Sequence, residues 1–440
     1  MGTVLTFLKK YTLIIFVSFI LGAYIGYKVL ESLGLQALID AIPIPEGSLA
    51  DKDVSIELIP IGRPLIQKEL STVEKKAKNI ILLIADGMSI SQITSYRLLK
   101  GGPNERISVD KFPVSGIVLT HAEDSFVTDS ASSATAFSSG RKTNNGALGL
   151  DNEKEELENI TEKLHQYGFV SSLISTSEIT HATPAAFASH VDLRWKTDEI
   201  SQQMINSNVM TILGGGRNFF LPEDVGGKRD DGVNLLEKVK STHTLLTEKS
   251  ELESFDLTET GKVIGLFAKE HLRDLEDPDN HSKEPSTSEM LDFAIKRSQS
   301  FGENGCNGFF IMVEGSQIDW AGHSNDMNYL VQEMEDFDNV VQMALDFAKK
   351  SEDTLVVVTS DHETGGLLIE PGSPTNYSSP EVKFSFNTGI GYGSHTGVPV
   401  PVYAYGPGSS NFTGTLDNTD IYFAMIEALD LKEQRGSCVD

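Results

Sequence analysis

Short apolar runs alternate with longer amphipathic stretches along most of the chain. The runs are rich in β-branched and aromatic residues and lack polar alternation, which is typical of strands buried on both faces. They span residues 79–85, 116–120, 169–175, 209–213, 308–313, 354–359 and 400–405. Helical patterns lie between several of them, at 160–167, 288–300 and 328–350. This alternation predicts an α/β fold in which helices cover both faces of a large, mostly parallel sheet. Residues 216–285 break the alternation and are rich in Gly, Asp and Lys, which predicts a surface elaboration.

The N-terminal segment has a different pattern. Lys9 and Lys10 precede residues 11–27, which carry no charge and are about as long as the shortest segment that crosses a bilayer. We expect residues 1–30 to be a membrane anchor with a cytoplasmic N-terminus, the alternative being a cleaved signal peptide. Residues 31–76 would form a stalk or a first peripheral element, and residues 77–435 a single folded domain. That domain would be exported to the periplasmic or extracellular face of the cytoplasmic membrane.

Charge and cysteine content narrow the possible partners. The formal net charge of −27 over 440 residues argues against nucleic acid, which is bound through a surplus of Lys and Arg. A phosphate ligand would therefore need a locally cationic site, made by metal ions or Arg. Cys306 and Cys438 are too few for a disulfide framework and lack metal-ligand spacing, and the sequence leaves open whether they pair.

Residues 127–140, VTDSASSATAFSSG, offer a candidate nucleophile. Thr128 and Asp129 are good capping residues, which places Ser130 in the first turn of a helix. There, free backbone N–H groups and the positive end of the helix dipole favour an oxyanion or a phosphate. The small side chains up to Phe137 would let a ligand approach the backbone closely. The structural alternative is a capped, buried helix rich in Ser and Ala.

Acidic residues follow three of the apolar runs directly. Asp86 follows the first, Glu314 follows 308–313, and Asp361-His362 come just after 354–359. The carboxyl ends of parallel strands lie at one edge of a sheet, so we expect these side chains to converge, although each acid alone could cap a helix. Asp86, Asp361 and His362 could then form a zinc site beside Ser130.

A second group of ligands lies further along the chain. Asp319 and His323 are four residues apart, which places both on one helix face within reach of one metal ion, although such a pair is more often a surface ion pair. His395, in a Gly-rich loop, could complete an Asp/His/His zinc site with an open position. The hard oxygens of Glu314 and Thr183 suit Mg²⁺, and Asp86 could bridge to that ion. Thr183 before Pro184 also fits a plain helix N-cap.

Six motifs in order give the sequence a family resemblance. They are IADG at Asp86, VTDSASSATAFSSGRKTNNGALG around Ser130, HATPAAFASHVDLR from His181 to Arg194, EGSQIDWAGH from Glu314 to His323, SDHETGG at Asp361 and His362, and SHTG at His395. In these motifs the chain resembles the alkaline phosphatases from about residue 79 to near 429. The resemblance implies a three-layer α/β/α catalytic domain that hydrolyses phosphate monoesters through a phosphoserine intermediate.

The resemblance also implies roles for individual residues. Ser130 would be the nucleophile, and Arg194 would clamp non-bridging phosphate oxygens. Two Zn²⁺ and one Mg²⁺ are expected per subunit, with one zinc on Asp319, His323 and His395, the second on Asp86, Asp361, His362 and Ser130, and magnesium on Asp86, Thr183 and Glu314. His181 and Trp320 occupy substrate-side positions that are Asp and Lys in some members, so this chain follows a His/Trp variant. Family analogy also suggests a homodimer.

Three other functions compete with this interpretation. A sulfatase would need a modified Cys or Ser in a different motif from DSASSATAF. A phosphodiesterase of the same superfamily usually has a Thr nucleophile and no counterpart of Arg194. A membrane-anchored, metal-dependent binding protein on an inactive scaffold is disfavoured because the nucleophile and every ligand are intact.

Overall fold

The computed structural model describes residues 52–55, 75–272, 283–372, 381–389, 392–431 and 436–439. The expected anchor at 11–27 and most of the expected stalk lie outside these residues. Residues 52–55, within the stalk range, form strand β1 (Lys52–Ser55), which pairs with a strand near residue 383. Within the described part of the chain, no helix is long and apolar enough to cross a membrane.

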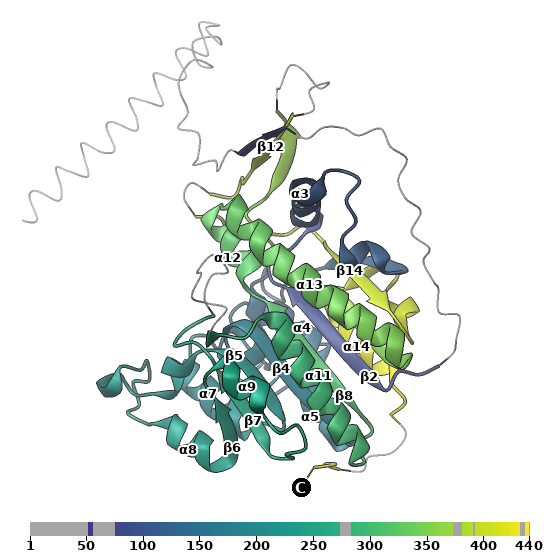
Figure 1. The fold of residues 1–440 in the computed structure, drawn as a ribbon. Coiled ribbons are helices and arrows are strands. Elements are labelled where there is room, and N and C mark those ends of the chain that lie inside the picture. The colour runs from purple at the N-terminus through teal and green to yellow at the C-terminus, as the bar shows by residue number, and fades with distance from the viewer. Residues whose placement is uncertain are drawn as a thin grey trace, which may run out of the picture. The chain divides into compact units, whose positions relative to one another are not determined.

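A ten-stranded sheet forms the centre of the fold (Figure 1). Its spatial order is β15-β3-β14-β9-β2-β8-β4-β5-β7-β6. The strands are β2 (Asn79–Ala85), β3 (Val114–Leu119), β4 (Phe169–Glu178), β5 (Thr211–Gly215), β6 (His243–Leu246), β7 (Lys262–Leu266), β8 (Gly308–Gly315), β9 (Thr354–Thr359), β14 (Val400–Tyr405) and β15 (Gly414–Asp417). Neighbours are parallel except at β14, which runs antiparallel to both β3 and β9. The predicted, mostly parallel sheet is confirmed.

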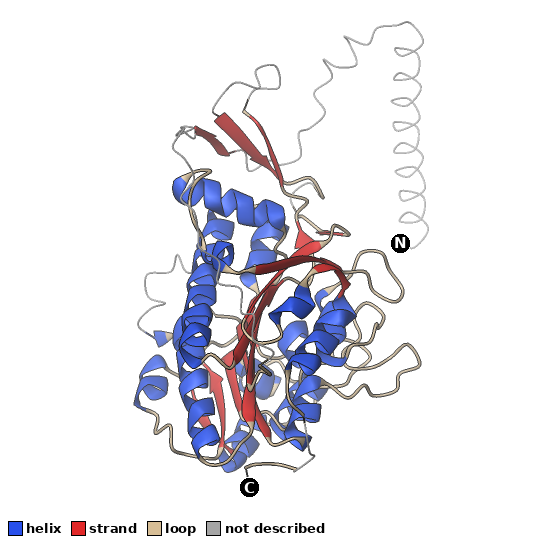
Figure 2. Ribbon diagram, turned by 90° about the vertical axis from the view of Figure 1, so that its right-hand side faces the viewer, coloured by secondary structure: helices blue, strands red, loops and turns tan. Residues whose placement is uncertain are grey.

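Helices cover both faces of the sheet and make the three layers visible in Figure 2. One layer contains α3 (Ile90–Gly101), α9 (Lys249–Ser254), α11 (Thr287–Glu303), α12 (Gln317–Ser324) and α13 (Met327–Ser351). The other contains α4 (Ser130–Ser139), α5 (Ile160–Gln166), α6 (Ala182–Ala185), α7 (Thr197–Asn206), α8 (Leu235–Thr242) and α14 (Asn418–Ala428). Successive side chains of β2 enter the two cores alternately, so the strand is buried on both faces and needs an uninterrupted apolar sequence.

Two expectations about the sheet are wrong. The run at 116–120 belongs to β3, which is only half buried, with Ile117 49% exposed, because helices do not cover both of its faces near the sheet edge. The supposed surface elaboration at 216–285 contributes β6 and β7 to the central sheet. These strands are four and five residues long and are separated by a short helix and polar turns. The polar composition of the whole segment therefore did not indicate them.

Two smaller sheets form beside the carboxyl edge of the main one. One contains β1, β12 (Glu381–Ser385) and β11 (Leu368–Pro371), and the other pairs β10 (Glu363–Thr364) with β13 (His395–Thr396). The register of the β10–β13 pair places His395 opposite Thr364. Because β14 is antiparallel to β9, the loop entering β14 lies at the same edge as the loop leaving β9. His395 therefore reaches the edge where Asp361 and His362 lie.

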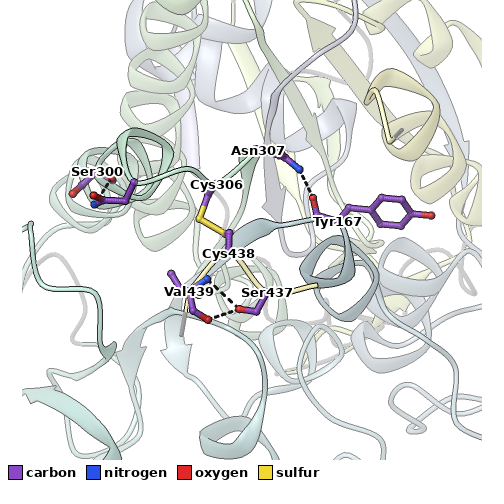
Figure 3. Close-up of a disulfide and its surroundings, with 8 residues drawn as sticks. Tyr167, Ser300, Cys306, Asn307, Ser437, Cys438 and Val439 are labelled. Carbon is purple, nitrogen blue, oxygen red and sulfur yellow. Dashed lines mark hydrogen bonds between the residues drawn. A yellow bond between two sulfur atoms is a disulfide. The ribbon is translucent and has the colours of Figure 1, made fainter. Parts of the chain in front are cut away.

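A disulfide joins Cys306, at the amino end of β8, to Cys438 in the C-terminal tail (Figure 3). The Cα atoms are 5.2 Å apart, and the bond closes a loop across 132 positions of sequence. The sequence left this pairing open, and the structure resolves it. The bond fixes the described tail residues 436–439 at the edge of the sheet that the strands enter.

Candidate active site

Ser130 is the first residue of α4, and Asp129 is its N-cap. Asp129 Oδ1 accepts a hydrogen bond of 3.0 Å from the backbone N–H of Ser132, which fixes the helix entry as the sequence predicts. Ser130 is 2% exposed, and its Oγ lies 3.2 Å from Nε2 of His362. The hydroxyl thus lies at the positive end of a ten-residue helix, beside a histidine from the loop that follows β9.

Arg194 is held beside this helix by two contacts. Its Nη1 donates to Asp129 Oδ2 and its Nη2 donates to His181 Nε2, both at 3.0 Å. The exposed ring of Trp195 lies against the guanidinium, 5.2 Å from its carbon. Asp129 therefore does two things at once: one carboxylate oxygen caps the helix of Ser130 and the other orients Arg194.

Asp319, His323 and His395 form the first cluster of potential metal ligands. Asp319 and His323 lie on one face of α12, with His323 Nε2 3.2 Å from Asp319 Oδ2, and His395 Nε2 is 3.6 Å from Asp319 Oδ1. The Nδ1 atoms of His323 and His395 donate to the backbone carbonyls of Gly393, at 2.7 Å, and Thr128, at 2.9 Å. Both Nε2 atoms must therefore carry lone pairs when the rings are neutral, yet they lie only 3.3 Å apart. Two such lone pairs repel unless a cation lies between them.

Asp86, Asp361 and His362 form the second cluster, between the carboxyl ends of β2 and β9. His362 Nε2 lies 3.5 Å from Asp86 Oδ1 and 3.1 Å from Asp361 Oδ2, and all three side chains are fully buried. The His362 ring is oriented by Thr364, whose hydroxyl lies 3.2 Å from Nδ1 and donates to Asp319. One carboxylate oxygen of Asp319 also lies within 4.8 Å of ligand atoms of Asp86 and His362, so the two clusters adjoin.

Glu314, Asp86 and His181 form the third cluster, with ligand atoms all within 4.8 Å of one another. Glu314 Oε2 accepts hydrogen bonds from Ser175 at 2.5 Å and Ser316 at 2.7 Å, whereas its Oε1 has no partner. Thr183 is fully buried with an unpartnered hydroxyl, and His181, not Thr183, is the N-cap of α6. The plain capping interpretation of Thr183 is therefore wrong.

Several buried polar atoms in these clusters have no hydrogen-bond partner. They are both carboxylate oxygens of Asp86, Oδ2 of Asp361, Oε1 of Glu314, Oγ1 of Thr183 and Nδ1 of His181. Each such atom costs roughly 1–3 kcal/mol when it is left unpaired in a protein interior. The set consists of carboxylates, an imidazole and a hydroxyl, which are ligands for zinc and magnesium. The donors present therefore fit metal ions.

Electrostatics support the same conclusion. Burial, followed by the charge of Asp361, raises the pKa of Asp86 well above its usual value, and burial raises the pKa of Asp361 to about 7. Burial and then the charge of Arg194 lower the pKa of His181 to about 3, which keeps its ring neutral. Burial likewise lowers the pKa of His362. Carboxylates crowded together beside neutral imidazoles need external positive charge to ionise at neutral pH.

Comparisons with known proteins agree with this arrangement. The family model described as alkaline phosphatase matches residues 77–382. Alkaline phosphatase 3 of Bacillus subtilis is 34% identical, with 82% of this chain and 92% of the relative covered. The solved alkaline phosphatase of the Antarctic bacterium TAB5 is 36% identical, with 82% of this chain and all of that one covered, at a TM-score of 0.73. The chain belongs to the alkaline phosphatase family. It is a hydrolase, as the sequence motifs indicated, and its three-layer fold is that of the family.

A third comparison concerns the metal content of a relative. A variant of the TAB5 alkaline phosphatase, in which a histidine is replaced by aspartate, was solved with magnesium bound in its M3 site. It is 36% identical, with 80% of this chain and 98% of that one covered, at a TM-score of 0.70. Alkaline phosphatases are metal-dependent enzymes, and the three ligand clusters of this phosphatase agree with that property.

Positions 181 and 320, which are Asp and Lys in some alkaline phosphatases, lie side by side at the third cluster. The ring of Trp320, on α12, stands edge-on to His181, with ring centroids 6.1 Å apart. His271 also packs against Trp320, with ring centroids 4.6 Å apart. A Lys at position 320 would lack these two ring contacts, whereas the indole makes both.

Several residues that support the site of the phosphatase escaped the sequence analysis. Ser175 and Ser316 hold Glu314, Thr364 orients His362, and the ring of Tyr392 stacks on His323 with centroids 4.7 Å apart. These residues are not typical metal ligands, so the search for ligand patterns did not select them. Their role depends on contacts between segments that are distant in the sequence. The one available signal was proximity: Thr364 lies in SDHETGG and Ser316 in EGSQIDWAGH.

The remaining described histidines of the phosphatase lie outside these three clusters. His190 bridges the carbonyl of Gly149, at 2.8 Å, and Glu162, at 3.0 Å, and so joins the loop of Gly149 to α5. His165 and His243 lie near the opposite edge of the sheet, and His281 lies outside the described residues.

Proposed function

We propose that this alkaline phosphatase hydrolyses phosphate monoesters through a phosphoserine intermediate on Ser130, with two Zn²⁺ and one Mg²⁺ per subunit. The observation that carries the proposal is the convergence of unpartnered, buried ligand atoms on the hydroxyl of Ser130. A binding protein on an inactive scaffold has no need of a serine at a helix N-terminus beside an oriented arginine.

The residues divide into three ligand sets. Asp319, His323 and His395 would hold one zinc ion, and Asp86, Asp361 and His362 the other, beside Ser130. Asp86, Thr183 and Glu314 would hold magnesium, with His181 close by. When bound, the zinc ions supply positive charge that lowers the pKa of the serine hydroxyl and offsets the charge that develops on the oxygens around phosphorus.

The chain's own residues would carry out the displacement in two halves. Ser130 Oγ attacks phosphorus, the bond from phosphorus to the ester oxygen breaks, and the alcohol leaves, taking up a proton. A water molecule then attacks the phosphoserine from the vacated side, the bond to Oγ breaks, and Ser130 regains a proton as inorganic phosphate departs. Throughout, the N–H groups at the start of α4 and the guanidinium of Arg194 favour the negative charge on the transferring group.

Arg194 supports monoesters over diesters as substrates. The guanidinium is a flat fork of donors that matches two oxygens of one phosphoryl group. In a diester, one of these oxygens carries a second organic group, which removes an acceptor and adds bulk where the fork lies. Asp129 and His181 hold the guanidinium in place before the substrate binds. The preference for monoesters would therefore not depend on a rearrangement of Arg194.

The identity of the third metal depends on His181. A neutral imidazole is a softer ligand than a carboxylate and suits zinc better than magnesium. The TAB5 variant with aspartate in place of a histidine holds magnesium in its M3 site, which supports the expectation that His181→Asp would favour magnesium here. Metal analysis of the purified variant against the parent enzyme would test this, and an unchanged magnesium content would contradict it.

We also propose that the enzyme works outside the cytoplasm, anchored through residues 11–27, and as a homodimer. The disulfide between Cys306 and Cys438 supports export, because such bonds form and persist in oxidising compartments. Cell fractionation would test the location, and light scattering of the purified enzyme would test the oligomeric state.

The decisive experiment identifies the phosphorylated residue. Acid quenching during turnover of a labelled monoester should trap phosphate on the peptide that contains Ser130. Ser130→Ala should abolish the label and most of the rate. Ser138→Ala is the matched control, because its hydroxyl lies in the same buried helix but donates only within it, to Thr135 O. Label retained in Ser130→Ala, or lost in Ser138→Ala, would contradict the proposal.

A further inference from the structure

A second polar pocket lies at the opposite edge of the central sheet from the candidate active site. Its volume is about 590 Å³, and it forms where β5, β6 and β7 begin. The active-site residues occupy the edge where strands end, so the two sites are separated by the length of the strands. Three basic residues line the pocket: His165, His243 and Lys262.

The sheet register explains why these basic groups converge. His243 and Lys262 are the first residues of β6 and β7 and are direct neighbours in the parallel pairing, so their side chains project from the same face. His165 comes from the last turn of α5, in the helix layer that covers this face. Burial, followed by the charge of Lys262, lowers the pKa of both His165 and His243, in agreement with their place in the same pocket as Lys262.

No described residue that lines the pocket is acidic. Lys262 is half buried, its ammonium donates to the carbonyl of Ser207, and burial lowers its pKa. The remaining N–H groups of this ammonium have no carboxylate to meet among the described residues. This is unusual in a chain with 63 Asp and Glu against 36 Lys and Arg, because a partly buried cation normally acquires a counter-ion.

The C-terminal tail closes one side of the pocket. Ser437 and Val439, on either side of Cys438, line it, and Figure 3 shows them next to the disulfide. The tail is also hydrogen-bonded to the end of α5, where the backbone N–H of Gly436 donates to Gln166 O at 3.0 Å. The disulfide therefore fixes one wall of the pocket.

We propose that this pocket binds an oxyanion, of which inorganic phosphate is the simplest example. The ammonium of Lys262 supplies the charge, and the imidazoles of His165 and His243 with the amides of Asn206 and Asn208 supply donors around it. None of the described residues that line the site is a carboxylate that could hold a catalytic metal ion, so we expect it to bind without hydrolysis. It is independent of Ser130 and of the proposed reaction.

Equilibrium dialysis of the metal-loaded enzyme against labelled inorganic phosphate tests the proposal. We expect two bound phosphates per chain in the parent enzyme, one at the active site and one at this pocket. Lys262→Gln should weaken binding of the second phosphate about ten- to hundredfold, which is the change expected for losing a hydrogen bond to a charged group. It should leave kcat and the competitive inhibition by phosphate unchanged, because Lys262 is far from Ser130. Lys240→Gln is the control: it removes the same charge from an exposed position on α8 that does not line the pocket.

The possible results separate this site from the active site. A single bound phosphate that Lys262→Gln leaves in place would overturn the inference, as would two phosphates in both enzymes. A single phosphate that Lys262→Gln abolishes would support the pocket while counting against phosphate binding at Ser130. Joint replacement of Cys306 and Cys438 by Ser should weaken the second phosphate alone, and an unchanged second affinity would show that the tail is not part of the site.

Discussion

Replacement of Arg194 by Ala should separate monoester from diester hydrolysis. Each of its two terminal nitrogens already has a partner at 3.0 Å, and its side chain is 10% exposed, so the fork is oriented before substrate binds. Loss of one preorganised donor to developing charge lowers kcat by about 10²–10³-fold, or roughly 2.7–4 kcal/mol. We expect a loss of that size on a monoester and less than about tenfold on a diester, which offers the fork one acceptor fewer.

The structural cost of the same substitution should be much smaller. Without Arg194, Asp129 still accepts from the N–H groups of Ser132 at 3.0 Å and Gly146 at 3.1 Å, so the cap of the Ser130 helix remains. The lost ion pair is partly exposed on the Asp129 side, and pairs of that kind contribute about 1 kcal/mol or less. A fall in activity with an almost unchanged melting temperature would therefore identify a catalytic effect.

The assay compares kcat/KM for p-nitrophenyl phosphate and for its diester analogue in the parent, Arg194→Ala and Arg194→Lys enzymes. Arg194→Lys should recover part of the monoester rate, since a point charge cannot make the paired contact. Asp129→Asn weakens the contact that orients Arg194. It should therefore lower the monoester rate of the parent enzyme, but it should have much less effect when it is added to Arg194→Ala. Equal losses on both substrates, or an additive effect of Asp129→Asn, would refute the assigned role of Arg194.

Four further predictions concern metal dependence, stability and location. Removal of metals should abolish hydrolysis and lower the melting temperature, with activity restored by zinc and increased by magnesium; full turnover by the metal-free enzyme would contradict the ligand assignment. The raised pKa values of Asp86 and Asp361 favour their protonated forms in the metal-free fold, so their contribution to stability is present below about pH 4 and lost as pH rises through about 7. Between about pH 4 and 7, the urea midpoint of the metal-free parent enzyme should fall more steeply with pH than the urea midpoint of metal-free Asp361→Asn. The same pH dependence in both proteins would contradict this contribution of Asp361. Joint replacement of Cys306 and Cys438 by Ser should lower the free energy of unfolding by up to about 4 kcal/mol, measured by urea denaturation, because a long loop is no longer closed; no change would show that the unfolded state is not constrained by the bond. The full chain should stay with membranes after a high-salt wash, whereas a chain beginning at Ser48 should be soluble; release of the intact chain by salt would contradict a spanning anchor.

The sequence was sufficient to predict features that depend only on neighbouring residues. The buried strand at 79–85 and the acid that follows it could be predicted because a doubly buried parallel strand has an uninterrupted apolar pattern and ends at the functional edge. Ser130 could be placed at a helix start because Asp129 is a strong capping residue.

Contacts between distant segments could not be predicted in the same way. The second function of Asp129, which orients Arg194 across 65 positions of sequence, leaves no trace in either local pattern. The short strands β6 and β7 were missed because propensity over four or five residues is weak and the sheet beside them determines their conformation. The pairing of Cys306 with Cys438 depends on the path of the tail, which no spacing rule describes.

The order of strands in the sheet has a consequence for biosynthesis. β3, made early, lies between β14 and β15, which come from the last part of the chain, and His395 lies just before β14. A nascent chain therefore carries an unpaired strand and an incomplete ligand set until its C-terminal segment has been synthesised. Metal loading would then follow completion of the chain, and any truncation before His395 would leave both an exposed strand edge and a site without its last candidate ligand.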